Sequence, residues 1–150
     1  MMTKQERTAK AEQLHNSGYN CAQSVALAFE DLTGLETKIV ENASAPFGGG
    51  VGRSQEVCGT ISGMVMVLSL IRNYDCSDQR QKMVLYNEEQ VLIKRFKEKH
   101  ETIVCRELLA LAKTKGFKHS CPRPMVPCAT PSRSSTRRWL SAAATSPTRR

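Results

Sequence analysis

The sequence predicts an all-α protein: a compact bundle of about five helices followed by a basic C-terminal tail. Three observations support this fold class. Apolar residues recur at helical spacing, capping residues or glycines mark the ends of the periodic stretches, and no strand-like alternation is convincing. A length of 150 residues with 40% apolar and 24% charged residues is typical of one globular domain. We expect that domain to span residues 1–122.

The first helices are predicted from polar composition and end signals. Residues 4–17 are rich in helix-forming polar residues and stop at Gly18. Asn20 is a candidate N-cap for a second helix, which ends at Gly34. A third, short helix is expected over residues 36–43.

A glycine-rich loop follows, from Phe47 to Gly52. Four glycines in this run place unusual demands on the backbone. The run lacks the G-K-[ST] ending of a phosphate-binding P-loop and does not fit the G-x-G-x-x-G dinucleotide motif. We therefore expect the glycines to serve close packing and not phosphate binding.

The next helix is expected to be central to the bundle, with Ser54 as its candidate N-cap. One face carries apolar residues at helical spacing: Cys58, Ile61, Val65 and Leu68. The same helix carries Gly59 and Gly63 four residues apart, and small residues in that spacing let a second backbone approach closely.

Two further helices complete the predicted bundle. A long one over residues 77–99 has a core stripe of Leu85, Leu92 and Phe96, widened by Val84 and Val91. The last opens near residue 102 and stops at residue 116, which is a glycine.

The tail, residues 123–150, differs from the rest of the chain. It holds six arginines and no acidic residue, which leaves only +2 of the +8 net charge to residues 1–122. This segment is rich in Arg, Ser, Thr, Pro and Ala, and its few apolar side chains offer little surface to bury. We expect a disordered or non-native extension, of the kind that a shifted reading frame produces, and no nucleic-acid or membrane partner.

Cysteine chemistry depends on the compartment. No apolar leader opens the chain, and the longest near-apolar run, 15 residues from Val57 to Ile71, is shorter than the roughly 20 needed to span a bilayer. We therefore expect a cytoplasmic protein, in which a disulfide framework is rare. Its six cysteines are then buried small hydrophobes, metal ligands or redox thiols.

Three cysteines, Cys21, Cys58 and Cys105, lie near predicted helix N-termini, where unpaired amides and the helix dipole stabilise a thiolate. Each also lies among apolar residues, and burial makes a cysteine unreactive. Spacing does not decide between these alternatives, because no C-x-x-C pair is present. The absence of C-x-x-C-H excludes covalent attachment of a c-type haem in the usual way.

Several motifs in sequence order resemble the C-GCAxxG-C-C family, which is described as redox-active mainly because of its cysteines. They are Gly18-Tyr19-Asn20-Cys21, Phe47-Gly48-Gly49-Gly50, Val57-Cys58-Gly59, Cys105-Arg106-Glu107-Leu108-Leu109 and Cys121-Pro122. The resemblance covers nearly all of residues 4–122. It implies an all-helical domain with a redox set of Cys21, Cys58, Cys105 and Cys121. Cys76 and Cys128 match none of the motifs, and the closing helix that the family has after Cys121-Pro122 is absent.

Three functions remain open for these residues. In the first, the protein is a thiol-based oxidoreductase in which Cys58 is the nucleophile, Cys21 resolves it, and Cys105 and Cys121 form a second pair or complete the set. In the second, the same four cysteines bind zinc or an iron–sulfur cluster. In the third, the chain is a non-catalytic helical module.

Two kinds of partner are consistent with these functions. A redox role implies a redox partner protein, and the glycine-bearing helix face offers a route to a homodimer.

Overall fold

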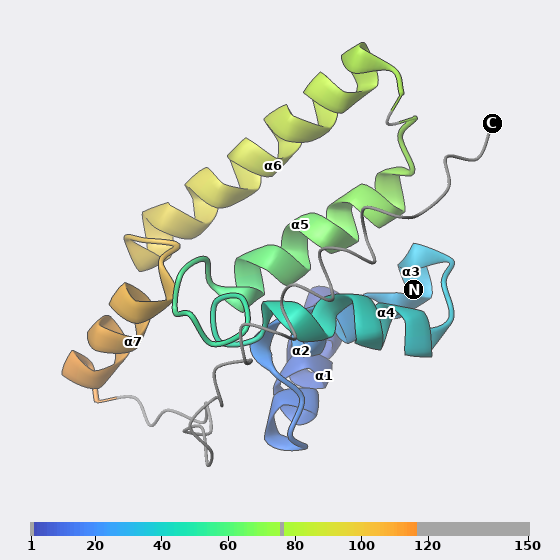
Figure 1. Ribbon diagram of the computed structural model, residues 1–150. Coiled ribbons are helices and arrows are strands. Elements are labelled where there is room, and N and C mark those ends of the chain that lie inside the picture. Colours follow the sequence, from blue (N-terminus) through green and yellow to red (C-terminus); the bar gives the residue numbers. More distant parts are fainter. Residues whose placement is uncertain (1, 76, 117–150) are drawn as a thin grey trace, which may run out of the picture.

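The computed structural model describes residues 2–75 and 77–116. These residues form seven α-helices and one 3₁₀ turn, η1 (Figure 1). In chain order they are α1 (Lys4–Asn16), α2 (Cys21–Ala28), α3 (Glu30–Thr33), α4 (Thr37–Ser44), η1 (Ala45–Phe47), α5 (Gly59–Arg72), α6 (Gln79–His100) and α7 (Cys105–Thr114). The all-α prediction is confirmed, with more helices than the expected five.

The N-terminus of α2 forms as predicted, but the helix is shorter than expected. Asn20 Oδ1 accepts hydrogen bonds from the amides of Ala22 and Gln23, both at 3.0 Å, and Gln23 Oε1 accepts from the Asn20 amide at 3.1 Å. The backbone then leaves the helical region at Phe29 (φ −120°), which divides the predicted helix into α2 and α3. Gly34, at φ +69°, ends α3 as the sequence predicts.

Two helices are central to the bundle: α2 and, as predicted, the glycine-bearing α5, which packs against α2, α3, α4 and α6. α2 packs against α1, α4 and α5, and its Ala26 and Leu27 form the core with Val40 of α4 and Val67 of α5. The alanines of α2 are fully buried, and such small side chains allow neighbours to approach from several directions.

The small residues of α5 serve this contact, as predicted. A Cβ built on Gly63 would lie 2.8 Å from the carbonyl oxygen of Ala22 and 3.2 Å from Cβ of Val25. The glycine-bearing face of α5 is therefore occupied by α2 of the same chain.

The start of α5 differs from the prediction. Ser54 does not cap this helix; its hydroxyl donates to the carbonyl of Gly50 within the loop, at 2.5 Å, and Cys58 is the N-cap residue. A helix cannot begin earlier because left-handed backbone, with φ between +61° and +67°, occurs at Val51, Arg53 and Gln55.

The long helix α6 packs mainly on α5, on the side away from α1 and α2 (Figure 1). Leu85 is buried as predicted, and Leu92 and Phe96 are partly buried. The predicted widening of this stripe is wrong, because Val84 and Val91 are 46% and 51% exposed. One side of α6 therefore presents apolar residues to solvent.

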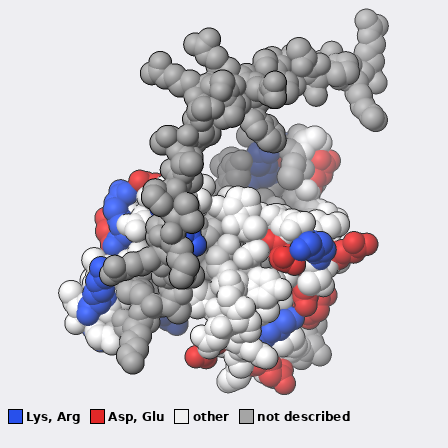
Figure 2. Space-filling view, turned by 60° about the horizontal axis from the view of Figure 1, so that its bottom comes forward, with Lys and Arg blue, Asp and Glu red and all other residues white. Residues whose placement is uncertain are grey.

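On the face shown in Figure 2, basic and acidic side chains are interspersed around a broad uncharged area. No helix among residues 2–75 and 77–116 has both the length and the apolar character needed to cross a membrane. Residues 117–150, and with them the predicted tail, lie outside the described residues, as do Cys76, Cys121 and Cys128.

Candidate functional site

A short antiparallel ladder joins the loop before α5 to the start of α7. Its centre is an isolated bridge between Val57 and Val104. Next to this bridge, the amides of Cys58 and Cys105 each donate to a carbonyl of the opposite segment, at 2.8 and 2.6 Å. Two cysteines with 46 residues between them in the sequence thus lie at the same short ladder.

Cys21 reaches this region from the first turn of α2. Its Sγ lies directly against Gly59, the residue after Cys58, so that a Cβ at Gly59 would overlap it. The same Cβ would lie 2.8 Å from the carbonyl oxygen of Phe47. Only glycine fits here, and its small size brings the Cys21 thiol to the first residue of α5.

Cys105 packs beneath the glycine loop. A Cβ at Gly50 would lie 2.8 Å from Cβ of Cys105 and 2.8 Å from the amide nitrogen of Glu56. Gly50 also has φ +75°, a conformation that favours glycine. The prediction that the glycine run serves close packing is confirmed here, because it seats the loop on Cys105.

We call Cys21, Cys58 and Cys105 the cysteine cluster. Cys21 and Cys58 are partly exposed, whereas Cys105 is only 6% exposed. No disulfide joins these three described cysteines. Each lies at a helix N-terminus, as predicted: Cys21 and Cys105 are the first residues of α2 and α7, and Cys58 is the N-cap of α5.

The three helix N-termini differ in what occupies their first amides. At α2 the Asn20 side chain accepts from the amides of residues 22 and 23. At α7 the amides of Cys105 and Arg106 donate to the carbonyls of Glu56 and Gln55, at 2.6 and 3.0 Å. In both helices, groups that could stabilise a thiolate are already engaged.

The first amides of α5 are not engaged in this way. Within the described part of the chain, no side-chain hydrogen bond caps α5, and its first backbone bond runs from Ser62 to the Cys58 carbonyl at 3.1 Å. At an N-cap position, the side chain normally accepts from the second and third amides of the helix. Cys58 is the N-cap residue here, and its side chain makes no hydrogen bond to these amides.

The structure gives no separate support to a metal site. Among residues 2–75 and 77–116, no group of three or more His, Cys, Asp and Glu side chains is placed to hold a metal ion. The predicted four-cysteine set includes Cys121, which lies outside this part of the chain.

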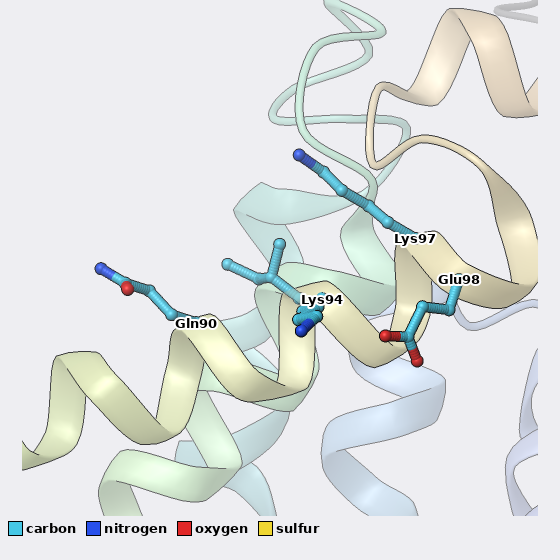
Figure 3. A pocket seen from close by; sticks show the side chains of 5 residues that line it. Gln90, Lys94, Lys97 and Glu98 are labelled. Carbon is cyan, nitrogen blue, oxygen red and sulfur yellow. The ribbon is translucent and has the colours of Figure 1, made fainter.

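A surface hollow on α6 lies apart from the cysteines. It is lined only by residues of that helix, whose side chains Figure 3 shows: Gln90, Ile93, Lys94, Lys97 and Glu98. Because one helix supplies every lining residue, the hollow has no opposing wall and is a weak candidate for a ligand site.

The ladder that carries the site is the feature that sequence reasoning missed. β-branched residues stand on both sides of it, Val57 on one and Ile103 and Val104 on the other, and such residues favour extended backbone. With one paired residue on each side, the ladder is too short to give an alternating pattern of apolar and polar residues. The sequence therefore offered little indication of extended backbone here.

Comparison with known protein families gives a match over most of the chain. The family model described as "Putative redox-active protein (C_GCAxxG_C_C)" matches residues 19–135. This range includes Cys21, Cys58, Cys105 and Cys121, and it extends beyond the predicted domain boundary at residue 122. No curated protein and no solved structure matches the chain.

Proposed function

Because the chain belongs to the C_GCAxxG_C_C family, whose model describes redox-active proteins, we propose that it exchanges thiols and disulfides through Cys58 and Cys21. The observation that carries this proposal is the difference between the helix N-termini. Of the three described cysteines, Cys58 alone stands at the start of a helix whose first amides are engaged neither by a capping side chain nor by a loop carbonyl. Such donors stabilise the thiolate, which is the attacking form.

The placement of Cys21 supports its role as the resolving cysteine. Its Sγ lies against Gly59, the residue that follows Cys58 in the chain. Cys105 is buried, so we expect its thiol to react more slowly, as one member of a second pair with Cys121. The proposed order of reactivity is therefore Cys58, then Cys21, then Cys105.

The proposed reaction transfers two electrons to a partner protein's disulfide. The Cys58 thiolate attacks one partner sulfur, a mixed disulfide forms, and the other partner sulfur leaves as a thiolate that takes a proton. The Cys21 thiol loses its proton to solvent and attacks the Cys58 sulfur. The Cys21–Cys58 disulfide forms, and the partner is released as a dithiol.

One equivalent of an aromatic disulfide, dithiobis(nitrobenzoate), tests this reaction on the reduced full chain. Attack by Cys58 releases one thionitrobenzoate, and resolution by Cys21 releases the second. In Cys21→Ser the adduct should persist on Cys58, whereas Cys105→Ser, the matched control, should behave like the unaltered chain. Peptide mapping of the adduct gives its position.

Two results would contradict the proposal. One is an adduct on Cys58 that is equally short-lived with and without Cys21. The other is protein purified without oxygen that carries stoichiometric iron or zinc, since its cysteines would then be ligands and not exchanging thiols.

A further inference from the structure

Asn20 lies where α2, η1 and the glycine loop meet. Its Oδ1 accepts from the amides of Ala22 and Gln23, both at 3.0 Å, while its Nδ2 donates to the carbonyl of Ala45 at 2.9 Å. Gly48 approaches so closely that a Cβ there would lie 2.5 Å from Asn20 Nδ2. One side chain thus contacts two of the segments that surround Cys21.

The oxygen of Asn20 engages two of the first amides of α2, the helix that begins at Cys21. A thiolate at the start of α2 would be stabilised by the first free amides of that helix. Asn20 Oδ1 already accepts from two of them. At α5, within the described residues, no side chain plays the part that Asn20 plays at α2.

We propose that Asn20 is a positioning residue that decides which cysteine attacks: by engaging the first amides of α2 it keeps Cys21 as the resolving thiol and leaves the attack to Cys58. This inference rests on the proposed function. It adds a residue that acts through the helix amides and takes no part in the sulfur exchange itself.

The nitrogen of Asn20 has a separate task. Its bond to Ala45 holds η1 on α2, and the last residue of η1, Phe47, places its carbonyl against Gly59 beside the Cys21 sulfur. The oxygen therefore engages the first amides of α2, and the nitrogen holds the turn next to Cys21. Different substitutions separate these two tasks.

The test compares the iodoacetamide alkylation rates of Cys21 and Cys58 in the reduced full chain, resolved by peptide mass spectrometry. Asn20→Ala frees the two amides, and we expect the rate of Cys21 relative to Cys58 to rise about tenfold, as for one charge-assisted hydrogen bond. Asn20→Ser keeps an accepting oxygen but loses the bond to Ala45, and its rate ratio should stay within about twofold of the unaltered chain.

Gln23→Ala is the matched control. It removes the other half of the capping box, the bond from the Asn20 amide to Gln23 Oε1, and leaves the two amides engaged by Asn20. It should weaken α2 without changing the rate ratio. Should Asn20→Ala fail to fold, Asn20→Gly also removes the oxygen, and glycine is tolerated at an N-cap much better than alanine.

An unchanged ratio in folded Asn20→Ala or Asn20→Gly would overturn the inference. So would an equal rise in Asn20→Ser, because the Ala45 bond and not the cap would then be responsible. The proposed function fails separately: in that case the unaltered chain itself would alkylate Cys58 no faster than Cys21.

Discussion

Arg7 shows how a polar helix is held in this bundle. α1 has few apolar residues, yet Arg7 is buried and donates to the carbonyl of Ala28 at 2.7 Å and to both carboxylate oxygens of Asp31 at 2.8 and 2.9 Å. Its guanidinium also lies over the ring of Phe29, 4.8 Å from the ring centre. These contacts tie α1 to the junction of α2 and α3.

The ion pair between Arg7 and Asp31 leads us to expect a loss of stability in acid. The hydrogen bonds from Arg7 lower the pKa of Asp31. A carboxyl whose pKa is lower in the folded protein contributes stability above its unfolded-state pKa of about 3.9, and loses it as the pH falls through the folded-state pKa. Between pH 5 and about pH 3, the urea midpoint should fall further for the unaltered chain than for Asp31→Asn. Parallel losses in the two proteins would show that the pair contributes nothing.

A second prediction concerns the stability of a variant at Gly59, which lies against the Cys21 sulfur. Glycine to alanine normally stabilises a helix. Gly59→Ala should instead destabilise the protein by about 1–3 kcal/mol, because the new methyl group would overlap the Cys21 sulfur. Urea unfolding measures the change, and Ser69→Ala on the same helix, expected to stay within about 0.5 kcal/mol, is the control. A stabilised Gly59→Ala would mean that Cys21 does not lie where we describe it.

The loop before α5 is the element that assembles the site. Its left-handed residues turn the chain back, its glycines let it lie on Cys105, and its ladder with α7 fixes the position of Cys58. Arg106 adds an ion pair with Glu56 at 2.6 Å, both side chains being exposed. Exposed pairs contribute little, so the backbone bonds and the packing hold the loop.

Backbone conformation in this loop can be tested at one residue. Val51 is 45% exposed and has φ +63°, which is unfavourable for a β-branched side chain. We expect Val51→Gly to raise the free energy of unfolding by about 0.5–1 kcal/mol. The same substitution at Val57, a bridge residue that is 40% exposed, should lower it by a similar amount. Equal losses in both variants, measured by urea unfolding, would contradict the left-handed conformation at Val51.

An element could be predicted when the residues that determine its ends lie close together in the sequence. Asn20 and Gln23 form a capping box three residues apart, and a sequence shows such a pair directly. Ser54 looked like an equally good cap, but left-handed residues surround it, and the loop that holds them pairs with the start of α7, a segment distant in the sequence. The start of α5 could therefore not be read from its own neighbourhood.

At the scale of the molecule, the order of the motifs indicated a set of four cysteines, Cys21, Cys58, Cys105 and Cys121, through the family resemblance. The described residues include the first three, and helix N-termini were predicted for these three from local pattern. The difference between them was not predictable. It depends on whether Asn20, a loop carbonyl or nothing among the described residues engages the first amides.

The predicted domain boundary at residue 122 can be tested by shortening the chain. We expect a chain that ends after Pro122 to unfold at the same urea concentration as the full chain, since the sequence predicts that residues 123–150 add no packed surface. The family match extends to residue 135, which is beyond the point where this shortened chain ends. A lower midpoint for the shortened chain would show that residues beyond 122 belong to the domain.

The central claim is that Cys58 and Cys21 exchange electrons as a pair. Its most direct test is a mass-spectrometric map of the disulfides in the full chain, quenched by acid and alkylation after equilibration in glutathione buffers of increasing oxidation. We predict that a Cys21–Cys58 linkage appears first and that Cys105 stays reduced over that range. A chain in which these two cysteines remain reduced, or in which Cys58 links first to another cysteine, would contradict the account.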